Sequence, residues 1–206
     1  MRNLAIAASL LAVSLPAHAN PTLEGVASGL YELEKTHAYL IWTVQHNGLS
    51  GYTVNFTDFD AALVFDAETP ANSELSVSIN PTALNTNYPD PVEKVEWETK
   101  LATDERFMNG TAFPEITFTS TGVEQTGEFT GTVTGDLTFL GVTQPVTLEV
   151  SYGGVSNPVW FGQRDVIGFT ASTSFNRSEF GSTAMIPGIS DEVEIEFSGE
   201  FLQAEE

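Results

Sequence analysis

The amino-acid sequence predicts an all-β fold in which an antiparallel sheet of about eight strands closes on itself, with one α-helix. Three observations favour this class. Apolar and polar residues alternate with a period of two in many short segments, as in strands with one face on an apolar interior and one on water. Only one segment has helical apolar spacing. No repeat or low-complexity linker divides the chain. A two-sheet sandwich is the competing architecture.

The first part of the chain has the pattern of a secretory signal peptide. A short positive start is followed by an apolar run over residues 4–15, which is too short to span a bilayer. Residues 17–19 then have the small-x-small form that signal peptidase cleaves. We expect residues 1–19 to be removed and residues 20–206 to form a single domain. A membrane anchor is the alternative, but no longer apolar segment follows.

Strands are expected wherever the alternation holds. The clearest case is near the C-terminus, where Val193, Ile195 and Phe197 alternate with glutamates. We interpret those glutamates as a solvated outer face. After a loose leader over residues 20–28, the predicted strands span residues 29–35, 38–46, 51–59, 60–65, 74–80, 115–123, 166–175 and 193–201.

Residues 127–152 predict a further pair of strands joined as a hairpin. The connection, residues 139–145, is unusual because it places Phe139, Leu140 and Val142 where turns are normally polar. We expect these residues to form a loop with an exposed Phe139–Leu140 tip.

Residues 92–108 are the one helical candidate. Val95, Trp97, Leu101 and Phe107 give a partial apolar stripe, and Gly110 follows as a stop signal. A loop rich in asparagine and proline precedes the helix over residues 81–91.

The composition excludes several classes of function. There is no cysteine, so thiol catalysis and cysteine-ligated metal sites are excluded, and the fold must be held by its core. The formal net charge is −21, with 28 acidic residues. Such a surface repels nucleic acid and anionic head groups, so no nucleic-acid partner is expected.

Several separated segments form a recognisable set: Gly29-Leu30-Tyr31-Glu32-Leu33, Thr36-His37 with His46, Phe56 to Asp66, Val77-Ser78-Ile79, Leu84-Asn85-Thr86, Leu101 to Phe107, Phe113 to Ser120, Gly135 to Thr143, Gly168 to Ala171, Asn176 to Gly181 and Ser190 to Val193. In content and in order they resemble the YceI-like family, the lipocalin-like polyisoprenoid-binding proteins.

The resemblance implies an extended antiparallel eight-stranded lipocalin-like barrel, exported to the periplasm, with a long apolar pocket for an isoprenoid chain such as a quinone or polyprenyl lipid. It does not imply catalysis or a cofactor, and it makes a homodimer plausible. Ala38 replaces the serine that the family usually has beside its first histidine. Leu140 replaces a common basic residue in the hairpin loop. Both changes remove polarity, so head-group contacts there do not carry over.

The candidate ligand-binding residues are mostly the inward-facing apolar side chains of the predicted strands. The same residues would also fill a dry core, so either an empty or a packed interior is compatible with them. Gly131, Gly135, Gly199 and Ala171 are small inward residues that leave space or allow close approach. The predicted site residues are Leu40, Trp42, Val44, His46, Phe56, Phe65, Ile79, Phe118, Leu137, Leu148, Phe169 and Arg177. Leu63, Val77, Val133 and Phe197 share the same inward parity.

His37 and His46 are the only histidines beyond the predicted leader. A transition-metal site needs three or four converging ligands, and an odd separation places these two on opposite faces of a continuous strand unless a bulge intervenes. We therefore expect no metal site. A hydrogen-bonding role is favoured for both, with a head-group contact at the barrel mouth as the second interpretation.

Arg177 follows the strand at 166–175 and is a rare cation in an anionic chain. One interpretation is a salt bridge that pins a strand to the helix or a loop, and the other is a polar anchor for a ligand. Catalysis is not expected, because no Gly-x-Ser-x-Gly elbow is present and acidic pairs arise by chance in so acidic a chain.

The leading hypothesis is a periplasmic protein that binds, transports or stores a long-chain isoprenoid lipid, without enzymatic activity. The alternative is a structural or stress-related interaction protein with a filled barrel, which would touch a partner or a membrane edge through the Phe139–Leu140 tip. A hydrolase ranks last. Expected partners are the lipid, a transient membrane contact and a second copy of the chain.

Overall fold

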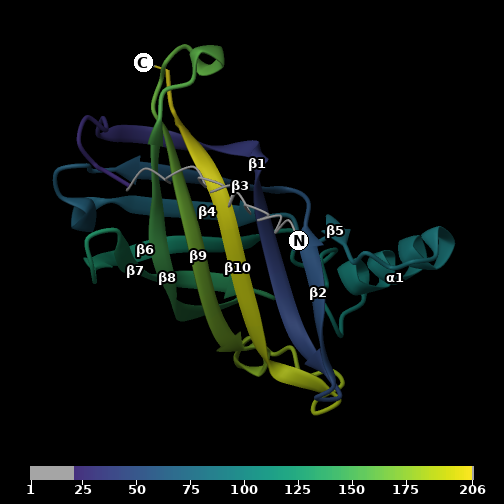
Figure 1. The fold of residues 1–206 in the computed structure, drawn as a ribbon. Coiled ribbons are helices and arrows are strands. Elements are labelled where there is room, and N and C mark those ends of the chain that lie inside the picture. Colours follow the sequence, from purple (N-terminus) through teal and green to yellow (C-terminus); the bar gives the residue numbers. More distant parts are fainter. Residues whose placement is uncertain (1–20, 206) are drawn as a thin grey trace, which may run out of the picture.

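A computed structural model describes residues 21–205, which form a closed antiparallel barrel with one helix (Figure 1). The predicted signal peptide lies outside the described residues. The ring closes because β10, the last strand, pairs with β1, the first. The predicted closed barrel is therefore confirmed and the sandwich is not. The ring consists of β1 (Gly29–His46), β3 (Phe59–Phe65), β4 (Glu74–Ile79), β6 (Ile116–Gln125), β7 (Thr130–Phe139), β8 (Val142–Ser156), β9 (Val166–Asn176) and β10 (Ile189–Gln203).

Two short strands extend the sheet beyond the ring. β2 (Ser50–Phe56) pairs with the second half of β1, and β5 (Leu84–Asn85) pairs with β2. The first half of β1 pairs instead with β3. Because β1 changes partners along its length, β2 and β3 diverge at one end of the barrel. Short 3₁₀ turns complete the connections: η1 (Pro70–Asn72), η2 (Val159–Phe161) and η3 (Arg177–Phe180).

The first long strand is continuous where the sequence predicts two. Segments 29–35 and 38–46 both belong to β1, and the expected break is a shift in the β1–β10 register between Glu34 and Tyr39. Such an irregularity bends a strand without ending it, since the pairing with β10 resumes on its far side.

The hairpin between β7 and β8 is tighter than predicted. Val142 already pairs with Phe139, so the connection is the two-residue turn Leu140–Gly141, with φ of 51° and 74°. Positive φ at both positions is the geometry that matches the twist of the flanking strands. The expected exposed tip is wrong. Phe139 packs against Phe180, with 5.9 Å between the ring centroids, and Gly141 lies against the ring of Phe113.

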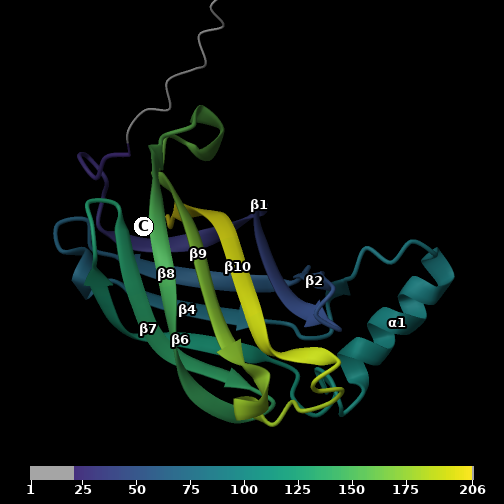
Figure 2. The same ribbon diagram turned by 60° about the horizontal axis from the view of Figure 1, so that its bottom comes forward.

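The helix α1 (Pro91–Thr103) begins one residue before the predicted position and ends five residues before it. The Asp90 side chain accepts hydrogen bonds from the amides of Val92 and Glu93, which caps the N-terminus. Figure 2 shows α1 standing beside β2 at one end of the barrel. Leu101 and Ala102 are buried, whereas Val95 is exposed, which contradicts its place in the predicted apolar stripe. No helix among residues 21–205 is long and apolar enough to cross a membrane.

Two of the small inward residues allow aromatic rings to approach the wall closely. A Cβ on Gly135 would lie 2.4 Å from Cζ of Phe118 and 2.5 Å from the carbonyl oxygen of Thr119. A Cβ on Gly199 would lie 2.6 Å from Cζ of Phe197. These glycines therefore make room for rings rather than for a ligand.

Replacing Gly135 with alanine should lower the free energy of unfolding by about 1–3 kcal/mol, because the added methyl group overlaps Phe118 and the β6 backbone. Urea unfolding measures the change. The matched control is Gly168→Ala in β9, where an added Cβ meets nothing within 4 Å, so its unfolding midpoint should stay the same or rise. Equal stability of the two variants would contradict this account of Gly135.

Candidate functional site

A cavity of about 680 Å³ runs through the inside of the barrel. Its size falls within the range of roughly 300–1,000 Å³ that is typical of small-molecule sites. Its wall is almost entirely apolar side chains from the ring strands, β2 and α1. The interior is therefore open, and the filled barrel that the alternative hypothesis requires is not observed.

All the sequence-predicted site residues line this cavity, and their role in binding stays a prediction. Those on β1 and β2 are Leu40, Trp42, Val44, His46 and Phe56; those on the remaining strands are Phe65, Ile79, Phe118, Leu137, Leu148 and Phe169; and Arg177 follows β9.

Aromatic rings make up much of the wall at the β8–β9 end of the barrel. Phe169 lies 5.4 Å from Tyr152, 6.0 Å from Phe201 and 6.1 Å from Phe65, measured between ring centroids. Such edge-on and tilted pairs fix the rings against one another. Phe169 faces inward but is only half-buried, because one side of the ring borders open space instead of packed atoms.

The sequence did not identify a second set of lining residues around α1. Trp97 and Leu101 of the helix and Phe107 and Met108 after it all reach the cavity, as does Tyr52 of β2. Trp97 packs against Phe107, with 6.0 Å between the ring centroids. The helical stripe was the available signal, but it did not show that the helix covers an opening between diverging strands.

Two polar groups lie in this wall beside α1. The hydroxyl of Tyr52 accepts a hydrogen bond of 2.7 Å from Nε1 of Trp97, and its own proton has no acceptor among the described residues. Nε1 of Trp42 is buried and has no hydrogen-bond partner among residues 21–205. Tyr52 lies opposite Val44 on β1, so it is the diagonal neighbour of Trp42. Of the two donors, the Tyr52 hydroxyl is therefore the one whose proton has no acceptor in the described part of the wall, whereas Nε1 of Trp42 is covered by neighbouring atoms.

Arg177 is buried and uses all its hydrogen-bonding capacity within the protein. A guanidinium has five N–H donors. Nε donates to the carbonyl of Ser190. Nη1 donates to the carbonyl and hydroxyl of Ser182, and Nη2 to the carbonyls of Ala184 and Ile189. Its partners are therefore backbone carbonyls and one serine hydroxyl of the β9–β10 loop and the start of β10, not the predicted carboxylate, and no donor is left for a ligand.

Asp191 binds Ser178, which lies in η3 just before the same loop. Its carboxylate accepts hydrogen bonds of 2.9 Å from the Ser178 amide and 2.7 Å from the Ser178 hydroxyl. The hydroxyl bond lowers the pKa of Asp191 below its usual value, and the nearby Arg177 adds to this. Burial lowers the pKa of Arg177, partly offset by Asp191. The loop is thus fixed by charge-assisted hydrogen bonds.

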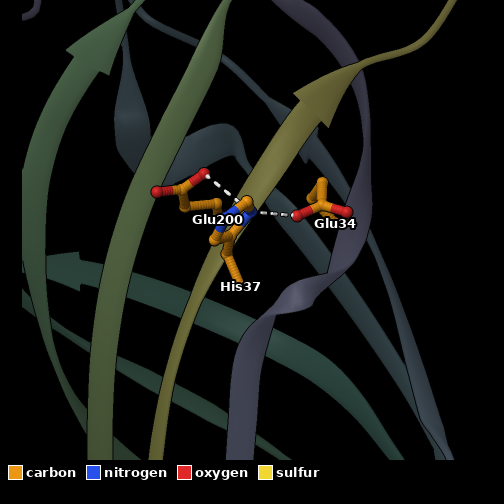
Figure 3. A group of neighbouring side chains, drawn as sticks. All are labelled: Glu34, His37 and Glu200. Carbon is orange, nitrogen blue, oxygen red and sulfur yellow. Dashed lines mark hydrogen bonds and ion pairs between the residues drawn. The ribbon is translucent and has the colours of Figure 1, made fainter.

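The two histidines lie in different places. His46 ends β1 at the edge of the cavity, beside Asn47. His37 lies on the outer surface at the β1 register shift, where its Nδ1 contacts Glu34 and approaches Glu200 to 3.8 Å (Figure 3). Glu34 and Glu200 are direct cross-strand partners, so His37 lies between two like charges at the seam that closes the barrel.

Among residues 21–205 this is the one group of three potential metal ligands within 4.8 Å of one another. The imidazole itself occupies the space between the carboxylates in Figure 3. Burial alone would raise the pKa of Glu34, but hydrogen bonds from Thr36 and His37 outweigh it and lower the pKa.

The barrel end remote from the β9–β10 loop is tied to the N-terminal segment. Asp165 accepts hydrogen bonds from the Ala27 amide at 2.7 Å and the Tyr31 hydroxyl at 3.2 Å. Tyr152 donates to the carbonyl of Thr22 at 3.0 Å. Burial, with a contribution from Asp165, raises the pKa of Tyr152 to about 12 and that of Tyr31 further. Both phenols therefore stay neutral donors that hold this segment on the barrel.

The fold and the site define a class of protein: a closed antiparallel barrel with an apolar cavity and no cationic group free within it among the described residues. The YceI-like domain model matches residues 31–201, and the chain belongs to this family.

Several bacterial proteins resemble this chain in sequence or in structure. Protein YceI of Shigella flexneri is 35% identical over 175 residues, which are 84% of this chain and 86% of the relative. The Campylobacter jejuni YCEI crystal structure has a TM-score of 0.64 at 27% identity and covers 78% of this chain and 90% of its own. A polyisoprenoid-binding domain from Saccharophagus degradans has a TM-score of 0.58 at 15% identity, covering 87% and 100%.

Replacing Arg177 with lysine should lower the free energy of unfolding by about 2–4 kcal/mol, because an ammonium group cannot reach the same set of carbonyls and leaves buried acceptors unpaired. Urea unfolding followed by tryptophan fluorescence measures the loss. Arg106→Lys is the control. Arg106 is exposed, so its ion pair with Asp104 and its contact with the Phe107 ring contribute little, and the unfolding midpoint should hardly move. If Arg177→Lys unfolds like the wild type, the guanidinium does not hold the loop.

Proposed function

We propose that this protein binds, and carries or stores, a long-chain isoprenoid lipid of the quinone or polyprenyl type inside its barrel, without catalysing a reaction. The observation that carries the proposal is the apolar cavity of about 680 Å³ enclosed by the ring strands and α1. The polyisoprenoid-binding domain with the same fold supports it. The predicted signal peptide supports a periplasmic location.

Apolar burial alone does not select the ligand. Transfer of one methylene group from water contributes about 0.8 kcal/mol, so a long tail would exceed the practical affinity limit of about −20 kcal/mol. An isoprenoid lipid, however, enters from a membrane, and moving its tail between two apolar surroundings is almost neutral. The fit of the tail to the cavity and the contacts of the head group therefore decide net affinity and selectivity.

The polar groups of the cavity favour a neutral head group. Arg177 is the one lysine or arginine that lines it among the described residues, and its donors are all used by loop carbonyls or a serine hydroxyl. A pyrophosphate would thus enter a strongly anionic protein without a free cationic partner. The Tyr52 hydroxyl, by contrast, can donate to a carbonyl oxygen. We infer a quinone-type head beside α1, with the tail along the barrel.

Titration with an isoprenoid quinone should quench the fluorescence of Trp42 and Trp97, which line the cavity. The Trp160→Phe background removes a tryptophan that is exposed outside the barrel. Tyr52→Phe should weaken quinone binding roughly threefold to tenfold, the value of one hydrogen bond, and leave the binding of a tail-only hydrocarbon competitor unchanged.

A tail-less quinone serves as the control for the apolar contribution and should bind at least a hundredfold more weakly. Quenching that is absent with the long-chain quinone, or equally strong with the tail-less one, would contradict the proposal. Equal quinone affinity of Tyr52→Phe and the background variant would remove Tyr52 as the head-group donor.

A further inference from the structure

Two loops lie side by side at one end of the barrel, where Ser50, Gly51, Ala184 and Met185 line the cavity. They are the β1–β2 turn, residues 47–49, and the β9–β10 loop, residues 181–188; together they are called the rim. The amide of Asn47 donates to the carbonyl of Gly188 at 2.6 Å, and the amide of Gln45 donates to the Ser190 hydroxyl at 2.9 Å. Segments from opposite parts of the chain thus form one surface.

The rim presents apolar side chains to the outside. Leu49 is 85% exposed, Met185 60% and Ile186 37%. Arg177 donates to the carbonyls of Ser182, Ala184 and Ile189, which fixes the backbone on both sides of Met185 and Ile186. The backbone of Asn47 and Met185 has positive φ, 53° and 64°, which turns the chain sharply at both tips. The exposed apolar side chains are therefore carried by loops whose backbone conformation is fixed.

The rim also lacks charge in a chain that is otherwise strongly acidic. Residues 45–57 and 181–190 contain no Asp, Glu, Lys or Arg, although the formal net charge is −21. At the other end of the cavity the lining includes Glu74, Glu124 and Glu128. The β6–β7 register places these last two near Tyr152 and the β8–β9 end, away from the rim. The two loops of the rim are themselves uncharged, whereas the opposite end of the cavity includes glutamates in its lining.

The rim is continuous with the cavity wall. Ser50 and Gly51, next to Leu49, line the cavity, and so do Ala184 and Met185 of the loop. A lipid leaving the cavity at this end would pass directly over the exposed apolar side chains.

We propose that the rim docks on the surface of a lipid bilayer with electrically neutral head groups, with Leu49, Met185 and Ile186 inserted at the interface. The proposal rests on the proposed function for the cargo that would cross, although docking itself is measured without cargo. Apolar side chains gain by leaving water for the bilayer interface, and an uncharged rim loses no hydration of ions there. The acidic remainder of the surface would repel an anionic bilayer.

Flotation of the purified protein with phosphatidylcholine vesicles tests the proposal. The wild type should float with these vesicles, and addition of anionic phosphatidylglycerol should reduce its binding at low salt. The double variant Leu49→Asp/Ile186→Asp should lose at least about tenfold in vesicle affinity, because two apolar anchors become charges. Neither residue lines the cavity.

Val159→Asp/Trp160→Asp is the matched control. These residues are 74% and 76% exposed in the β8–β9 connection, at the opposite end of β9 from the rim. The control should bind vesicles like the wild type. Equal loss in both double variants would show non-specific adhesion, and an unchanged rim variant or a wild type that does not float would overturn the proposal.

Quinone titration of the rim variant separates the two proposals. Retained quinone affinity with lost flotation supports docking by the rim alone. Flotation by a protein that binds no quinone would refute the proposed cargo and leave docking standing. If the wild type does not float but a protein partner protects Leu49 and Ile186 in its complex, the rim is a protein interface and bilayer docking is wrong.

Discussion

The pairing of β1 with β10 closes the barrel. It turns a sheet with two free edges into a closed ring, so every apolar face along the ring strands must turn to a common interior. A ring of eight strands encloses space that side chains can fill or leave open. Here the inward rings of Phe118 and Phe197 lie close to the wall over Gly135 and Gly199, and a cavity remains.

The two ends of the barrel are fixed by different chemistry. At one end, Tyr152 and Asp165 hold the N-terminal segment by neutral and charged hydrogen bonds. At the other end, Arg177 donates hydrogen bonds to carbonyls of the β9–β10 loop and the start of β10. The Asp191 carboxylate accepts a hydrogen bond from the amide of Ser178. A buried cation surrounded by carbonyl oxygens organises the loop but stays unavailable to ligands. The wall of the cavity is therefore mostly apolar, with glutamates at the end remote from the rim and the Tyr52 hydroxyl beside α1.

The fold and the inner wall were largely predictable from the sequence, because a period of two assigns each strand residue to the inside or the outside. Glu192, Glu194 and Glu196 are exposed on β10 as predicted. Features set by tertiary pairing were not predictable. The Leu140–Gly141 turn is two residues long because the β7–β8 register continues to Phe139, and Val95 faces water because only part of α1 covers the opening. Four of the five hydrogen-bond acceptors of Arg177 are backbone carbonyls, which every residue type carries and which the sequence therefore does not reveal.

The proposed function requires that one long apolar molecule occupies the barrel. Native mass spectrometry of the protein, purified from exporting cells without detergent, measures this occupancy. We expect an added mass of one isoprenoid lipid per chain, released on unfolding and recovered with a neutral head group. A protein that carries the mass of its polypeptide alone, and takes up no such lipid when exposed to lipid extract, would contradict it.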